Sequence, residues 1–300
     1  MSAFDGVDLA ALPPPDLVEE LNYETILASL LDDLRDKWPA FDALVESDPA
    51  IKLAEVSAYL AFLLRQRVND AARAVLLPTS TGADLDNLAA LFGVARLVID
   101  PGDADAAPPV PPKLEDDPAL RRRAQLALEA STAAGTKGRY LFYALGADPL
   151  VADAAVSAHD PSPGDVTIAV LSADPASWIA DAALISAVNT IVQADDVRAL
   201  CDTVIVTAAQ VIDYEVEATI TYLPGAAAEA AESVATERIE ALAAERRLGR
   251  DLTRSAVFAA LHAPGVHNVV LTKPAADVIV GPLEAARCTS ITLSNGGIDE

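Results

Sequence analysis

Cysteine, histidine and aromatic side chains are scarce in this chain of 300 residues. It holds two cysteines, three histidines and 5% aromatic residues. Cys201 and Cys288 lie far apart and form no CxxC pair, so the sequence carries no thiol-based metal or redox motif. We expect two reduced, buried thiols, as in a protein made in a cytoplasm.

Basic residues are also few. The chain has 21 Lys and Arg against 45 Asp and Glu, which gives a formal net charge of −24. Residues 1–50 alone hold twelve acidic and two basic side chains. Such an acidic chain is repelled by phosphate backbones and by anionic lipid surfaces. We therefore expect no nucleic acid and no membrane among its partners.

A long uninterrupted hydrophobic run is absent as well. The longest apolar helical stretch, from Val56 to Leu77, is broken by charged side chains such as Arg65 and Asp70. It is therefore not expected to span a membrane. Residues 1–15 contain aspartates and no basic start, so no secretory signal peptide is expected.

Catalytic motifs are missing too: the chain has no GxSxG, no GxGxxG and no P-loop. Asp84 and Asp86 form a DxD string at a predicted helix start, where interaction with the free backbone amides explains them better than metal binding. His262 and His267 are separated by a Pro-Gly pair and lack the spacing of a helical zinc pair. The sequence predicts no catalytic residue, no metal site and no cofactor, and hence no enzyme.

Hydrophobic residues are abundant, at 52% of the chain, which is enough for real cores in about two domains. Much of this fraction is alanine, which lets backbones approach closely but buries little area per residue. We therefore expect closely packed helices, thin cores, and subunit contacts that add stability.

Residues 1–96 predict a helical N-terminal region. A first helix is capped by Asp16 and ends at Pro39, and a short second helix covers residues 41–45. A third helix begins directly after Asp48, because the proline that follows is favoured at the first helical position.

The third helix carries the strongest periodic pattern in the chain. Apolar side chains recur every three or four residues and so share one helical face, with basic side chains nearby. We predict that this face binds a partner protein in an inter-chain helix bundle; the alternative is that it forms the internal core of residues 1–96. The predicted partner-binding residues are Leu53, Val56, Leu60, Leu63, Leu64, Val68, Arg65, Arg67 and Arg73.

Residues 97–118 are rich in proline and predict a stiff linker. Beyond it, helical and strand patterns mix, so the predicted fold class is α+β: a helical N-terminal region followed by two related α+β modules. The first module covers residues 119–209 and the second 210–300. Arg121–Arg123 follow two aspartates, so local charge pairing or a subunit contact is expected for them.

The two modules share a recurring pattern. Phe142–Leu145 and Phe258–Leu261 each follow a glycine and a capping threonine, and each precedes a turn and a strand. In each module an Asp-Val pair follows, and a further strand is predicted to begin there, at Asp165 and at Asp277. Two related modules explain the pattern; the alternative is a common helix–turn–strand unit that occurs twice by chance.

Several strings together resemble the baseplate J-like proteins of contractile-tailed phages. None is a reaction motif, and their order and spacing carry the resemblance over nearly the whole chain. The strings are Tyr23–Leu31, Phe41–Pro49, Arg65–Arg73, Thr81–Asp86, Leu91–Gly93, Arg247–Ala256 and Ala285–Thr289.

The resemblance implies a structural wedge subunit of a virion tail baseplate, made and assembled in the host cytoplasm. Such proteins contact copies of themselves, as a homodimer or ring, and other baseplate wedge subunits. They join wedges into a six-fold ring around the tail tube and rearrange when the sheath contracts. The alternatives are the equivalent subunit of a tail-derived injection machine, of bacteriocin or secretion type, and a tail-associated hydrolase. Two carboxylates converging in a cleft would favour the hydrolase, and an exposed apolar face the structural subunit.

Overall fold

The computed structural model divides the chain into two compact units. The first holds residues 1–95 and 117–121, and the second holds residues 96–116 and 122–300. The residues whose structure is described are 15, 18–41, 47–131, 135–158, 162–174, 177–225 and 228–299.

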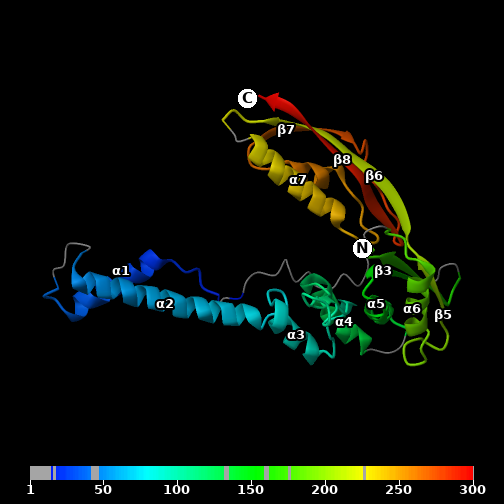
Figure 1. The fold of residues 1–300 in the computed structure, drawn as a ribbon, viewed down its shortest axis with the longest axis horizontal. Coiled ribbons are helices and arrows are strands. Elements are labelled where there is room, and N and C mark those ends of the chain that lie inside the picture. Colours follow the sequence, from blue (N-terminus) through cyan, green and yellow to red (C-terminus); the bar gives the residue numbers. More distant parts are fainter. Residues whose placement is uncertain are drawn as a thin grey trace. The chain divides into compact units, whose positions relative to one another are not determined.

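Three helices build the first unit: α1 (Tyr23–Lys37), α2 (Pro49–Ala74) and α3 (Gly82–Leu91). Polar side chains cap the first two, because Asn22 and Asp48 each accept a hydrogen bond from a backbone N–H of the first turn. α1 lies alongside α2 (Figure 1), so the two form a helical hairpin.

The first helix begins later than predicted, because its cap is Asn22. The predicted cap, Asp16, lies outside the described residues, as do residues 42–46, which contain most of the short helix predicted over 41–45. The third predicted helix is confirmed as α2, and it begins directly after Asp48.

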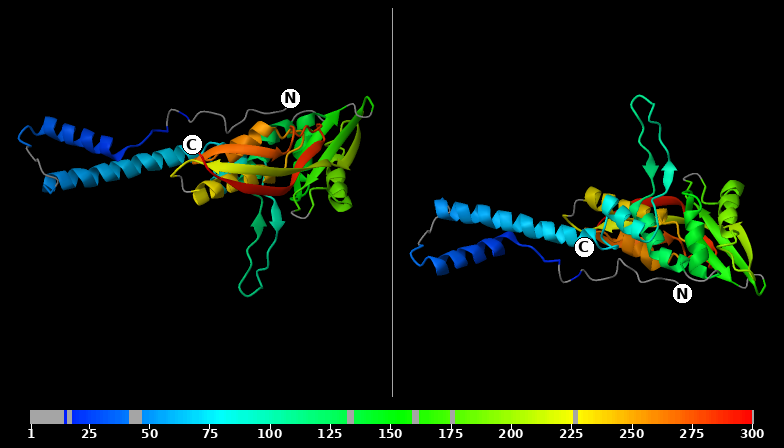
Figure 2. Two further views of the ribbon diagram at one scale, coloured as in Figure 1. Left: turned by 90° about the horizontal axis from the view of Figure 1, so that it is seen from above. Right: turned by 90° about the horizontal axis from the view of Figure 1, so that it is seen from below.

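Residues 97–118 contain a paired hairpin where the sequence predicted only a linker. β1 (Val98–Asp100) runs antiparallel to β2 (Lys113–Leu114), and Asp103 bridges to Val110 farther along. Figure 2 shows the hairpin, in teal, as a narrow arm. The prolines of this arm have no N–H to donate, which restricts the ladder to short pieces.

The first module contains three helices and one three-stranded sheet. In the sheet, β4 is central, antiparallel to β3 and parallel to β5, and α6 makes the connection between the parallel strands. Its main apolar cluster lies between the sheet and the helices, around the fully buried Tyr140, Ile168 and Val188. The elements are α4 (Asp117–Ala130), α5 (Lys137–Gly146), β3 (Val151–Ala158), β4 (Asp165–Ser172), α6 (Ala182–Val192) and β5 (Thr203–Ala208).

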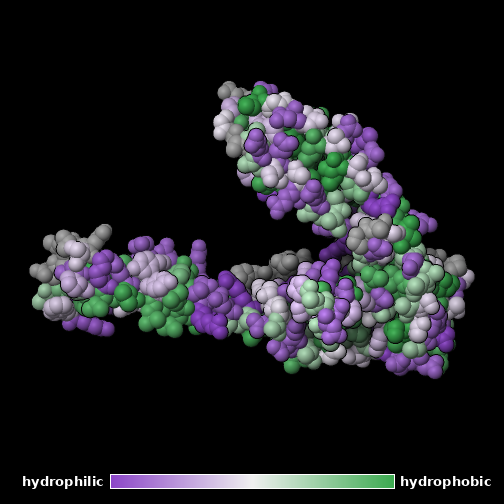
Figure 3. Space-filling model, in the orientation of Figure 1, coloured by the Kyte–Doolittle hydropathy of each residue, from purple (hydrophilic) through white to green (hydrophobic). Residues whose placement is uncertain are grey.

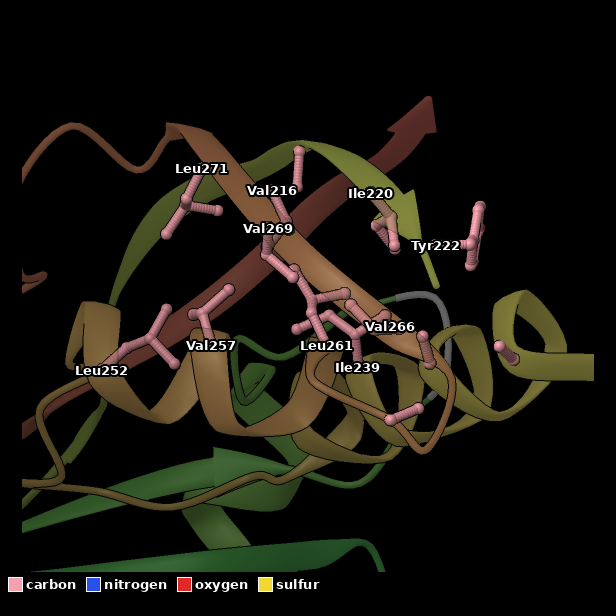
Figure 4. Close-up of a cluster of buried hydrophobic side chains, with 14 of the residues drawn as sticks. Val216, Ile220, Tyr222, Ile239, Leu252, Val257, Leu261, Val266, Val269 and Leu271 are labelled. Carbon is pink, nitrogen blue, oxygen red and sulfur yellow. The ribbon is translucent and has the colours of Figure 1, made fainter. Parts of the chain in front are cut away.

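The second module also contains a three-stranded sheet, with helices on one face. The central strand β6 is antiparallel to β7 and parallel to β8. Figure 4 shows its core, where Ile220, Ile239 and Leu261 meet from the sheet and the two helices. The elements are β6 (Gln210–Tyr222), α7 (Ala228–Ala244), α8 (Arg254–Leu261), β7 (Val266–Lys273) and β8 (Glu284–Ile298).

The predicted helix–turn–strand repeat is present as α5–β3 and α8–β7, but the order of the strands around it differs. The central strand follows the repeat in the first module, as β4, and precedes it in the second, as β6. The prediction that Asp277 leads into a strand is wrong: Val278 makes only an isolated bridge with Leu252. Prolines at positions 274 and 282 interrupt strand pairing in this segment.

Polar groups join the two modules within the second unit. Asp153 of β3, only 3% exposed, accepts hydrogen bonds from Arg122 Nη1 (2.7 Å) and from the backbone N–H of Leu248 (2.8 Å). Arg246 donates to the carbonyl of Ser172 and lies over the ring of Trp178, 5.0 Å from its centroid. We call these contacts the inter-module latch.

The expectation of two buried thiols is wrong for this structure. Cys201 is exposed and Cys288 is half-buried, and both are free. Cys201 lies between α6 and β5, outside the sheet, where a small apolar side chain gains no cover from the core.

Candidate partner-docking face

α2 has two different faces. Ala58 and Asn69 are buried on one of them, and Ile26 of α1 is buried in the same helical hairpin. The side chain of Asn69 accepts from the backbone N–H of Glu19 (3.0 Å) and donates to its carbonyl (2.8 Å). This pair of hydrogen bonds fixes the segment before α1 onto one side of α2 and sets which side remains open.

The opposite face carries the predicted apolar stripe, and it is open. Because successive helical residues turn by about 100°, the stripe lies on the side of α2 away from Ala58 and Asn69. Its side chains are 44–69% exposed, and Figure 3 shows hydrophobic atoms, in green, along this part of the first unit. We call it the docking stripe: Leu53, Val56, Leu60, Leu63, Leu64 and Val68.

The three arginines predicted beside the stripe have different surroundings. Arg65 lies 3.8 Å from the carboxylate of Glu19, and Arg73 lies 3.9 Å from that of Asp70. Both are exposed ion pairs, which contribute little to stability. Arg67 is exposed and lies four residues after Leu63 and three after Leu64, on the same side as the stripe.

Sequence analysis missed one member of this surface. Tyr59 is 57% exposed and lies three residues after Val56, so it borders the docking stripe. Its helical spacing is the signal that could have found it. An aromatic side chain with an exposed ring is a common anchor in protein interfaces.

The internal-core alternative for the stripe predicts that other parts of the first unit cover it. Among the described residues, the seven buried apolar side chains of this unit do not include any member of the stripe. They are Ile26, Ala58, Ala72, Leu85, Ala89, Val94 and Leu120. The role of the stripe in binding a partner remains a prediction.

The residues with possible catalytic or metal roles are scattered. Asp84 lies in the first turn of α3, His262 follows the last turn of α8, and His267 lies in β7. Among the described residues, no group of three His, Cys, Asp or Glu side chains is placed to hold a metal ion. An open groove along α7 gathers several glutamates, but one helix alone lines it, so their carboxylates spread over a surface and do not converge in a cleft.

The arginine run Arg121–Arg123 is used for internal contacts. Arg121 donates to the carbonyls of Leu77 and Ser80. Arg122 pairs with Asp153 in the inter-module latch. Arg123 pairs with Glu115 at the base of the β1–β2 arm, with 2.8 Å between Arg123 Nε and Glu115 Oε1. Two arginines of this run are therefore charge-paired, Arg122 with Asp153 and Arg123 with Glu115; the subunit contact that was the alternative remains untested.

Two protein-family models match this chain, one in its N-terminal half and one in its C-terminal half. The model of the baseplate J-like N-terminal domain matches residues 46–103, which contain the whole docking stripe. The model of the baseplate J-like C-terminal domain matches residues 214–294. A curated relative, "Baseplate protein J" of Escherichia phage P2, is 40% identical over 302 residues, covering 98% of this chain and 99% of that protein. The chain belongs to the baseplate J-like family.

A solved structure is also similar, at a lower level. It is a chain in the cryo-EM structure of the anti-feeding prophage baseplate, with 13% sequence identity and a TM-score of 0.40. The match covers 60% of this chain and 44% of that chain. Within the part of this chain that the structure describes, no helix is both long and apolar enough to cross a membrane.

Proposed function

We propose that this J-like chain is a structural wedge subunit of a tail baseplate, located in the virion tail and without enzymatic activity. The observation that carries the proposal is the docking stripe, which extends for about 22 Å along α2 with every member well exposed. The relative from phage P2, which this chain matches over nearly its full length, is named a baseplate protein. We propose further that such wedges join into a six-fold ring around the tail tube and rearrange on sheath contraction.

The stripe supports a helical mode of docking. Leu60 lies between Val56 and Leu64, four residues away on each side, and Leu63 lies three residues on, which is the spacing of helix-in-groove and bundle contacts. Large exposed apolar side chains in a continuous row are a feature of interaction surfaces in soluble proteins. We propose that another baseplate wedge subunit supplies the helix or helices that cover this row. A bacteriocin or secretion-type injection machine could use the same surface.

The test is the substitution Leu60→Asp, with Lys52→Asp as the control. Leu60 is 56% exposed, so the aspartate can remain hydrated in the free subunit, and its effect on folding there should be about 1 kcal/mol or less. In a docked bundle the same carboxylate loses water without a partner, which costs several kcal/mol. Lys52 is exposed and paired with its neighbour Glu55, and its substitution should change incorporation little.

Two properties of the Leu60→Asp subunit decide the matter: its circular dichroism spectrum and its presence in assembled particles. The proposal expects a soluble subunit with unchanged helix content that is absent from particles. A subunit that unfolds on its own would show that the stripe belongs to the internal core. Normal incorporation into particles would refute both interpretations.

A further inference from the structure

The β1–β2 arm leaves most of its surface open. Every residue of its two strands is exposed, and Figure 2 shows the arm extending away from the two larger sheets of its own unit. A two-stranded hairpin that packs on no other element is marginally stable in water. The arm therefore depends on what holds its base and on what covers its surface.

The base of the arm is fixed by the buried ion pair of Glu115 and Arg123, each less than a tenth exposed. Glu115 also accepts a hydrogen bond from the backbone N–H of Leu97 (3.1 Å), and its carbonyl accepts one from Arg96 Nη1 (2.6 Å). A buried ion pair contributes little more stability than apolar side chains of the same volume. Its main effect here is to fix the direction in which the arm leaves the unit.

The surface of the arm combines exposed apolar side chains with a stiff backbone. Val98 and Leu114 lie opposite each other on the two strands and are 50% and 45% exposed, and Val110, nearer the tip, is 51% exposed. Residues 97–112 include five prolines, whose fixed φ angles leave little backbone freedom to lose on binding. These are the properties of a preorganised binding element.

Charge limits what can cover the arm. Residues 97–112 contain three aspartates, at positions 100, 103 and 105, and no basic residue. Such a segment repels nucleic acid and anionic lipid surfaces. A second copy of the chain is disfavoured as well, because its net charge is −24 and its arginine run, Arg121–Arg123, is used for internal contacts. The occupant with matching charge is a basic protein surface.

We infer that the β1–β2 arm binds a protein other than this chain, at a surface where lysine or arginine side chains surround an apolar patch. The apolar side chains of the arm lose water on the patch, and the aspartates near the tip pair with the basic rim. The arm shares no residue with the docking stripe of α2. The inference therefore goes beyond the proposed function by adding a second contact surface with a partner of different chemistry.

The experiment places a photoreactive side chain, p-benzoylphenylalanine, in place of Val110 in the full chain, within cells that produce the tail particles. Irradiation should join it to one protein other than this chain, and mass spectrometry should map the bond to a segment rich in lysine or arginine. The same group in place of Leu200, which is 99% exposed, controls for chance encounters and should give little of this product.

The charge requirement is tested in the same cells. Asp105→Lys should lower the yield of the cross-link at least about fivefold, because it places like charges against each other at the rim. Asp195→Lys makes the same change at an exposed acid between α6 and β5, and it should leave the yield unchanged.

A second variant covers the case in which the group at position 110 disturbs the tip. The photoreactive side chain then replaces Val98, and residues 101–112 are exchanged for Asn-Gly, a two-residue turn that preserves an antiparallel hairpin. The intact arm should give the cross-link from position 98. The shortened arm should lose most of it, because Val110 and two of the three aspartates are gone.

The inference is overturned by the absence of a cross-link from both positions, or by a product that is another copy of this chain or nucleic acid. It is also overturned by an equal yield from Leu200, or by a yield that Asp105→Lys leaves unchanged. The cross-link is measured whether or not the subunit enters particles, so its result is independent of the α2 test.

Discussion

Replacing Asp153 by alanine should loosen the contact between the two α+β modules. Its carboxylate is almost fully buried and accepts hydrogen bonds from Arg122 and from the backbone N–H groups of Leu248 and Ala154. It is thus an acidic group held by one positive charge and two amides. The bond to Leu248 connects β3 of the first module with the segment after α7 of the second.

The magnitude follows from what each donor can do after the substitution. Arg122 is about one third exposed, so its guanidinium can turn to water and little free energy is lost there. The hydrogen bond from the N–H of Leu248 is partly buried, and a buried donor left without an acceptor costs about 1–3 kcal/mol. With the loss of the hydrogen bonds to a charged acceptor, we expect the free energy of opening the latch to fall by about 2–4 kcal/mol.

Hydrogen exchange measured by mass spectrometry can test this locally, without assuming a single unfolding transition. Peptides covering residues 246–250 should exchange about 30- to 700-fold faster in Asp153→Ala, since each 1.4 kcal/mol is a factor of ten. Asp195→Ala is the matched control, because Asp195 is an exposed acid of the same module, and its exchange should be unchanged. A change below about twofold in Asp153→Ala would refute the reasoning.

Three further predictions concern other groups. Glu115→Gln should destabilise the base of the β1–β2 arm by about 3 kcal/mol, because the buried charge of Arg123 then loses the Glu115 carboxylate. Hydrogen exchange of the backbone amide of Leu97 should become faster in this variant. Burial raises the pKa of Tyr140 to about 12, whereas the unfolded chain releases this proton near pH 10. The stabilisation by neutral Tyr140 is therefore complete below pH 10 and lost as pH rises towards 12. Between these pH values the denaturation midpoint should fall less in Tyr140→Phe than in the parent chain. Asp84→Asn with Asp86→Asn should leave particle infectivity nearly intact, since neither residue is proposed to act in catalysis.

The sequence predicted the helix α2 well because its periodicity is strong and local. It could not show which face of α2 the first helix covers. That choice depends on Ala58 and Asn69, a small residue and a polar one, whose burial has no signature in hydrophobic spacing. The hydrogen bonds between Asn69 and Glu19 span fifty positions along the chain, and only the folded backbone brings them together.

The sequence did not predict the pairing within residues 97–118, for a related reason. Proline content indicates a stiff segment, but it does not show whether two stiff halves pair with each other. Here Glu115 and Arg123 hold the base of the arm as a buried ion pair, and nothing in the local pattern marks Glu115 as different from the acids around it. The strand predicted after Asp277 was wrong because similarity of the preceding helix and turn does not fix where the next strand lies in a sheet.

The part of the first unit that the structure describes has a small apolar core. Of its seven buried apolar residues in the described part of the chain, three are alanines, which bury little area. The six members of the docking stripe are larger, and each would contribute up to about 1.5–3 kcal/mol if fully covered. More apolar surface is therefore available to α2 from a partner than from its own unit. A partner that binds only the folded form stabilises it, so the proposed docking would link the folding of this unit to its assembly. If the stripe formed only the internal core, its leucine and valine side chains should be buried, but they are 44–69% exposed.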